Sequence, residues 1–130
     1  MKKAILSLLI LLNSSFMFAQ NKKANTVLTP EEKAQNKTNQ LHKLVNLNET
    51  QKNNSYLIYL KEELKYIDDS KNYVPNSKEA QNAEKERKEY VDTHLKLVLD
   101  ENQYSRLMEY RKSKIAKRKT SETLFLENDI

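Results

Sequence analysis

The chain contains no glycine among its 130 residues, and this absence constrains the fold more than any other feature of the sequence. Glycine reaches positive φ without a steric penalty, so tight strand turns and phosphate-binding loops depend on it. A chain without glycine has few means of forming β-hairpins and has no Walker or dinucleotide-binding loop. We therefore expect an all-α protein whose long helices are joined by turns that contain Asn and Pro.

The first residues have the pattern of a cleavable signal peptide. Lys2 and Lys3 precede an uncharged apolar run at residues 4–12, and residues 16–19 lead to a cleavage site before Gln20. The apolar run is too short to span a bilayer comfortably, and a retained N-terminal anchor helix is the alternative. We predict that residues 1–19 are a signal peptide and that the mature chain is periplasmic, with no transmembrane segment.

Composition narrows the class of the mature chain. Residues 1–19 hold two lysines and no acidic residue, so their removal lowers the net charge from +5 to +3. That mild charge does not suggest nucleic acid as a partner. The chain has no cysteine and only two histidines, which leaves little material for a catalytic site. We expect a protein that is not an enzyme, with no catalytic residues and no cofactor.

Three segments carry the same helix-start signal, in which a capping residue is followed three positions later by Glu or Gln. Ser77 is expected to begin a further helix after the break at Pro75. Together these signals predict helices at about residues 30–45, 49–69, 78–98 and 101–119. Residues 28–119 form the predicted domain, between a disordered lead-in at 20–27 and a flexible tail at 120–130. The motif residues are Leu28, Thr29 and Glu32, then Leu47, Asn48 and Gln51, then Leu99, Asp100 and Gln103.

The two halves of the domain resemble each other. When the chain is shifted by 52 residues, six of the twenty residues in 32–51 are identical to those in 84–103. This repetition indicates two antiparallel helical hairpins, one formed by the first two helices and one by the last two. Large apolar residues are widely spaced in the first and third helices, so each hairpin has a thin core and would gain by pairing with a second copy.

Residues 47–51 and 99–103 form two pentads that resemble the motif of the LTXXQ family of periplasmic stress proteins, the Spy/CpxP-like group. The small size of the chain and its predicted export signal fit this resemblance, which is strongest to the Bacteroidetes-type branch of the family. Asn48 and Asp100 replace the threonine of the motif and preserve capping. The resemblance covers residues 28–114. It implies a cradle-like four-helix arrangement, often a homodimer, and ATP-independent binding of unfolded or stress-damaged envelope proteins.

Other functions are compatible with the same features. An envelope-stress adaptor would act with a stress-sensor protein as its partner. A metal-responsive periplasmic sensor or buffer for zinc or copper is a second alternative, and a structural helical protein of the envelope is a third.

Two tyrosines of the second helix are candidates for client binding. Tyr59 and Tyr66 lie opposite the stripe of Leu57, Leu60 and Leu64, which we expect to face the core. Tyrosine suits adaptable binding because it offers apolar area with a hydroxyl at its edge. The alternatives are that neighbouring helices or a dimer partner cover this side.

A basic run supplies the second candidate surface. Residues 111–119 contain six basic residues and no acidic one, and Arg111, Lys112, Lys114 and Lys117 are its client-binding candidates. We expect them to attract acidic segments of unfolded clients. A solvated helix end whose cations complement the helix dipole is the alternative, as is contact with anionic lipid head groups.

The two histidines occupy equivalent positions of the repeat. His42 and His94 each lie five residues before a pentad leucine and are weak candidates for a metal site. Two histidines without cysteine and without a neighbouring ligand pair are a poor supply of metal ligands. We therefore expect ordinary helix-surface histidines and no metal.

Overall fold

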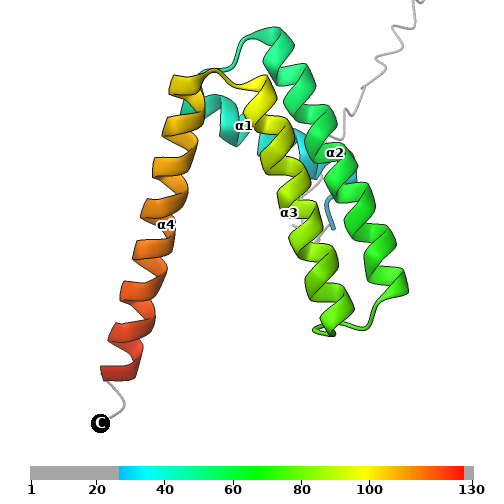
Figure 1. Cartoon of the computed structure of the whole chain (residues 1–130), viewed down its shortest axis with the longest axis vertical. Helices are drawn as coiled ribbons and strands as arrows, with labels where there is room; N and C mark the ends of the chain where they lie inside the picture. The colour runs from blue at the N-terminus through cyan, green and yellow to red at the C-terminus, as the bar shows by residue number, and fades with distance from the viewer. Residues whose placement is uncertain (1–26, 128–130) are drawn as a thin grey trace, which may run out of the picture.

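The computed structural model describes the backbone of residues 27–127 and the side chains of residues 27–121. This part of the chain is all-helical, with α1 at Pro30–Val45, α2 at Glu49–Asn72, α3 at Lys78–Val98 and α4 at Glu101–Glu127, and it contains no strand (Figure 1). None of these helices combines the length and the apolar character that crossing a membrane requires. The predicted signal peptide at residues 1–19 and most of the predicted lead-in at 20–27 lie outside the described residues.

The helix starts follow the capping signals of the sequence. Thr29 caps α1 and forms a reciprocal capping box with Glu32. Asn48 caps α2 in the same way with Gln51, and the Ser77 side chain accepts a hydrogen bond from the third backbone amide of α3. Each box satisfies backbone N–H groups that have no partner inside the helix. The predicted starts of all four helices are therefore confirmed.

The ends of the helices agree less uniformly with the prediction. Asn46 ends α1 in the left-handed conformation, at φ 57°, as expected of an Asn that replaces glycine. The fourth helix was expected to end near Lys119, but α4 continues to Glu127, so the tail boundary predicted at residue 120 falls inside a helix. No glycine or proline interrupts residues 101–127, and the basic run is rich in good helix formers.

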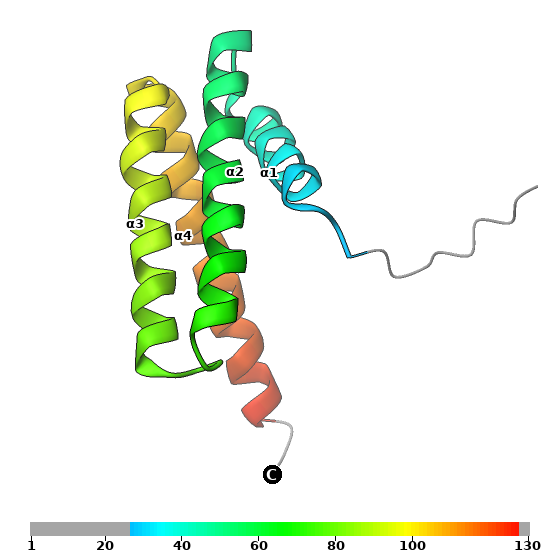
Figure 2. The same cartoon turned by 90° about the vertical axis from the view of Figure 1, so that its right-hand side faces the viewer.

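The helices pair differently from the two-hairpin prediction. α2 and α3 run antiparallel side by side, and α1 packs on the other side of α2 (Figure 2). α4 contacts α1 and diverges from α3, so the predicted hairpin of the last two helices is wrong (Figure 1). The reason is that the first turns of α4 are bonded to the end of α1, which directs α4 away from its neighbour in sequence. We call the end of the molecule where the connections 46–48 and 99–100 meet the apex.

The hydrophobic core lies at the apex. Leu47 and Leu99, the leucines of the two pentads, are both buried there, and Tyr104 packs against the same cluster. Leu99 precedes the capping residue of α4 and Tyr104 lies one turn into the helix, which are the two positions of a hydrophobic staple. The remaining buried members are Leu41, Val45, Ile58, Val91, Leu95 and Leu107.

The leucine stripe of α2 does not face this core, which corrects the expectation from the sequence. Leu57 is 59% exposed and Leu64 is 51% exposed. The buried side of α2 instead carries the polar residues Ser55, Glu63 and Asp69. Burial of two carboxylates is tolerated because cations from α1 and α3 pair with them. Apolar periodicity therefore identified the helix but assigned its inward side wrongly.

Candidate functional site

The two pentad glutamines bind each other at the apex. The side-chain amide of Gln51 donates to Oε1 of Gln103 over 2.7 Å, and the amide of Gln103 donates to Oε1 of Gln51 over 3.0 Å. Each Oε1 also accepts the backbone N–H of its own capping residue, Asn48 or Asp100, at 3.0 Å. Each glutamine therefore closes one capping box and joins two helix starts at the same time.

Each amide also reaches the end of the helix that precedes the other pentad. Gln51 Nε2 donates to the carbonyl of Val98 at 3.1 Å, and Gln103 Nε2 donates to the carbonyl of Asn46 at 3.3 Å. These two bonds are equivalent under the 52-residue shift of the repeat. Glutamine is required for this role because a carboxylate cannot donate a hydrogen bond. The pentads were expected to be capping devices, and this bridge between them was missed because neither pentad alone indicates its partner.

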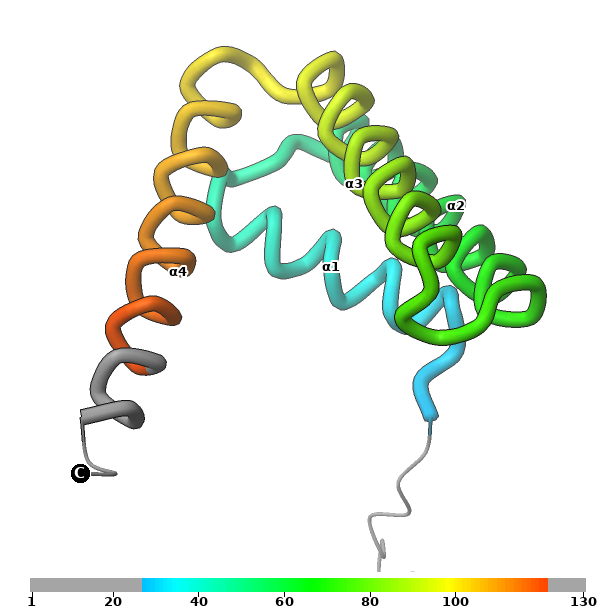
Figure 3. Tube along the Cα trace, turned by 60° about the horizontal axis from the view of Figure 1, so that its bottom comes forward, coloured from blue at the N-terminus to red at the C-terminus, as the bar shows by residue number. Residues whose placement is uncertain are grey.

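Beside the apex, α4 and the other three helices enclose two adjoining cavities, which we call the trough. The lining residues of the two cavities come from α4 and from the other three helices, whose arrangement Figure 3 shows. The cavities have volumes of about 630 and 460 Å³. Both are lined by Lys37, Tyr59, Arg111 and Lys114, so they form one continuous depression. This size is typical of binding clefts for small ligands or side-chain clusters.

The floor of the trough is apolar, with Tyr59 at its centre. Tyr59 is half-buried and packs against the apex core, and burial raises the pKa of its hydroxyl to about 12. Leu41, Leu44 and Leu107 line the cavity between α1 and α4. Val91 of α3 contributes to the second cavity. One of the two predicted tyrosines therefore lies in the trough.

Tyr66 lies outside the trough, farther along α2. Its ring is flanked by two cations, with Lys33 Nζ at 5.8 Å and the guanidinium of Arg87 at 5.2 Å from the ring centroid. The side chain lines neither of the two trough cavities but a separate one, which shares Lys37, Glu62 and Lys88 with the second trough cavity. Tyr59 and Tyr66 therefore lie on the same side of α2 but line neighbouring cavities.

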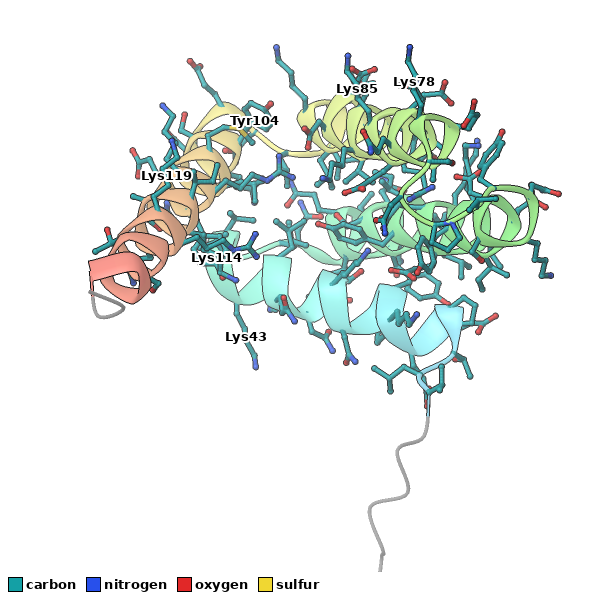
Figure 4. All side chains as sticks on the ribbon, turned by 90° about the horizontal axis from the view of Figure 1, so that it is seen from below. Lys43, Lys78, Lys85, Tyr104, Lys114 and Lys119 are labelled. Carbon is teal, nitrogen blue, oxygen red and sulfur yellow. The ribbon has the colours of Figure 1, made fainter. Side chains whose placement is uncertain are left out.

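The basic run divides between the trough and the outer surface. Arg111 and Lys114 line both cavities, whereas Lys112 and Lys117 line neither. Arg118, which the sequence prediction left out, lines the second cavity. Positions 111, 114 and 118 share one side of α4 because they are spaced by three and four residues. In Figure 4, Lys114 lies on the side of α4 that faces α1.

Arg111 and Lys37, which line both cavities of the trough, have carboxylate partners. Arg111 donates to Asp92 of α3 over 2.6 Å. Lys37 of α1 pairs with Glu62 and with Glu63, the latter at 2.6 Å. Burial alone would lower the pKa of Lys37, but the hydrogen bonds and charges of these two glutamates outweigh it and raise the pKa. The carboxylates thus hold the cations at the trough wall.

A buried ion pair joins α2 to α3 on the side away from the apex. Arg87 donates to Asp69, and Lys65 Nζ lies 3.2 Å from the same carboxylate. Burial favours a higher pKa for Asp69, yet the hydrogen bonds from Arg87 and Lys65 hold that pKa below its ordinary value. A sequence search for apolar stripes could not find this pair, because its members are charged residues on two separate helices.

The histidines do not form a metal site in the part of the chain that the structure describes. His94 Nδ1 lies 2.7 Å from the carbonyl of Tyr90 on its own helix, and His42 Nδ1 is buried. No group of three or more His, Cys, Asp or Glu side chains among the described residues could hold a metal ion.

Comparison with known proteins returns no matching family model, no matching curated protein and no matching solved structure. The resemblance to the LTXXQ family therefore rests on the pentads, on the size of the chain and on its N-terminal segment.

Proposed function

We propose that this chain is an ATP-independent periplasmic chaperone that holds unfolded or stress-damaged envelope proteins in the trough. The observation that carries the proposal is the combination of an apolar floor, centred on Tyr59, with a row of cations on α4. Unfolded proteins expose apolar side chains and charge together, so this combination suits them. Holding of this kind needs only binding and release, and the resemblance to the LTXXQ family supports the same function.

The two features have separable roles in the proposed mechanism. The cations Arg111, Lys114 and Arg118 attract acidic client segments over a range that salt limits to about 10 Å at 0.1 M. The apolar floor then holds the captured segment by contact, which salt does not screen. Attraction should therefore govern the rate of capture, and the floor should govern its strength.

We further propose that the chain acts as a homodimer. Leu57, Leu64 and Leu97 lie on α2 and α3 and are 59%, 51% and 80% exposed. Three leucines exposed on neighbouring helices favour association with a second copy, which would cover them. Replacing Leu57 and Leu64 by Asp should shift the mass in multi-angle light scattering from dimer to monomer while the helix content stays the same. A parent chain that is monomeric at high concentration would contradict this part of the proposal.

The chaperone proposal is tested by light scattering from a reduced, aggregating client mixed with the mature chain without nucleotide. Tyr59→Ser should weaken protection at every salt concentration, whereas Tyr66→Ser, outside the trough, should act like the parent. Replacing Lys114 and Arg118 by Gln should slow capture at low salt. The matched control replaces Lys112 and Lys117 by Gln, which removes the same charge from the same helix and should have a much smaller effect.

Two results would contradict the proposal. The first is a parent chain that does not suppress aggregation at equimolar concentration. The second is a set of folded trough variants that protect the client as well as the parent does. Submicromolar zinc or copper binding without client protection would favour the metal-sensor alternative instead.

A further inference from the structure

Apolar and cationic side chains line both cavities of the trough, but the two sets differ. The cavity between α1 and α4 is lined by Leu41, Leu44, Leu107 and Tyr59, and also by the cations Lys37, Lys43, Arg111 and Lys114. The adjoining cavity, towards the free end of α4, adds Lys88 and Arg118 to the cations that the two cavities share, and it is also lined by Val91, Ile115, Glu62 and Asp92. The three leucines therefore lie in the cavity nearer the apex, Arg118 lies in the other cavity, and Lys114 borders both.

The positive charge of the cavity that contains Arg118 is only partly neutralised. Arg111 is paired with Asp92, and Lys88 is paired with Glu84 at 2.6 Å. Lys114 and Arg118 have no carboxylate partner among residues 27–121, and Lys114 Nζ instead lies 5.0 Å from the centroid of the Tyr110 ring. Two neighbouring cations on one side of a helix, neither of them paired with a carboxylate, favour an anionic group between them.

We infer that the trough binds a single-chain anionic amphiphile such as a long-chain carboxylate, with its hydrocarbon tail against Leu41, Leu44 and Leu107 and its head group between Lys114 and Arg118. The charge pattern selects the head group, and the apolar floor selects the tail. The cavity volumes of about 630 and 460 Å³ fall in the range of small-ligand sites. The inference uses the same trough as the proposed chaperone function but does not depend on it.

The two recognition elements predict how affinity changes with the ligand. Each methylene that is fully buried lowers the dissociation constant about fourfold, so a longer tail binds more tightly until the three leucines are covered. An amphiphile with the same tail and a cationic head should bind at least about tenfold more weakly, because it meets like charges. A phosphate or sulfate head group shares the chemistry of the carboxylate and should bind as well.

Isothermal titration calorimetry of the full mature chain tests the inference with dodecanoate below its micellar concentration. Octanoate tests the tail, and dodecyltrimethylammonium tests the head; each should bind at least about tenfold more weakly than dodecanoate. Replacing Lys114 and Arg118 by Gln should weaken dodecanoate binding by about tenfold or more. The matched control, with Lys112 and Lys117 replaced by Gln, should bind dodecanoate like the parent.

Leu44→Ser tests the tail end separately, because Leu44 lies at the edge of the core and its replacement should leave the helix content unchanged. It should reduce the difference in affinity between dodecanoate and octanoate. A preserved difference would overturn the placement of the tail.

Other outcomes would overturn the whole inference. Equal binding of the anionic and cationic amphiphiles would show unspecific apolar contact, and equal weakening in the trough and control variants would show unspecific attraction to a basic helix. The light-scattering assay, run on the same samples, separates the two proposals. Client protection without dodecanoate binding would leave the chaperone proposal intact and refute the amphiphile site. Dodecanoate binding without client protection would support the amphiphile site and refute the chaperone proposal.

Discussion

Replacing Gln103 by Glu tests whether the pentad glutamines hold the apex together. The substitution keeps the capping box, because a carboxylate oxygen still accepts the backbone N–H of Asp100, at 3.0 Å in the parent chain. It also keeps the acceptor for Gln51 Nε2. It removes the amide donor, which bonds Gln51 Oε1 at 3.0 Å and the carbonyl of Asn46 at 3.3 Å. The capping box and one bond of the glutamine pair are therefore kept, and only the bonds that the Gln103 amide donates are lost.

The expected cost follows from these lost bonds. Each buried acceptor that loses its donor costs about 1–3 kcal/mol, and Gln103 is only 9% exposed. The new carboxylate would also place an oxygen opposite the carbonyl of Asn46. We therefore expect the free energy of unfolding to fall by about 2–4 kcal/mol, which is a large part of the stability of a small domain.

The pH dependence provides a second signature. Burial and the facing carbonyls should raise the folded-state pKa of the new carboxylate above the unfolded value of about 4.3. The folded state then favours the protonated form, whose O–H again donates a hydrogen bond. The loss of stability relative to the parent should be largest at pH 8, above the folded-state pKa, and should decrease as the pH falls through it.

Urea denaturation followed by circular dichroism at 222 nm measures the effect for parent and variant at pH 8 and pH 5. Glu32→Gln is the matched control, because Glu32 closes an exposed capping box that contacts no second pentad. That control should change the free energy of unfolding by no more than about 0.5 kcal/mol. The reasoning is refuted if Gln103→Glu costs as little as the control at both pH values.

Three further predictions concern caps, charge and the histidines. Asp100→Ala removes the acceptor for the Gln103 backbone N–H and should cost about 0.5–2 kcal/mol in the same urea experiment, with client protection reduced only in proportion to unfolding. The pKa of Asp69 is lowered in the folded state, so its pair with Arg87 stabilises the fold fully above the unfolded pKa of about 3.9. This stabilisation is lost as the pH falls through the folded-state pKa. Asp69→Asn should therefore make the free energy of unfolding less dependent on pH in the acid range. Replacing His42 and His94 together by Gln should leave the circular dichroism spectrum and client protection unchanged, and a large loss of protection would favour the metal-sensor alternative.

The local parts of the fold could be predicted because their causes lie within a few residues of chain. A capping box joins positions three residues apart, so Thr29 with Glu32 and Asn48 with Gln51 could be identified from the sequence alone. The left-handed Asn46 that ends α1 has an equally local cause, because Asn is the residue that most readily replaces glycine in this conformation. Cap chemistry therefore determines the number of helices and their starts.

The packing of α2 could not be predicted from apolar periodicity. Its inward side carries Glu63 and Asp69, which are buried because Lys37 of α1 and Arg87 of α3 pair with them. Such pairs join positions that are distant in sequence, and no pattern within α2 reveals them. The leucine stripe was assigned to the core on the general rule that apolar residues are buried. Folded proteins also leave many apolar side chains exposed, so this rule could not place the leucines of α2.

The direction of α4 links the pentads to the trough. α3 and α4 are joined by only two residues, which would ordinarily make them neighbours, yet Gln103 and Leu107 hold the first turns of α4 at the apex beside the end of α1. From residue 112 to residue 121 every side chain of α4 is exposed, so in this stretch α4 has no packed neighbour to fix its position. The width of the trough is therefore governed by the few contacts at the apex. A small change in those contacts, such as the loss of the glutamine pair, should be amplified along α4 into a larger change at Arg118. For this reason Gln103→Glu should weaken dodecanoate binding in the trough even without urea, where the helices remain folded. An unchanged dodecanoate affinity in that variant would show that α4 is held by something other than the contacts at the apex.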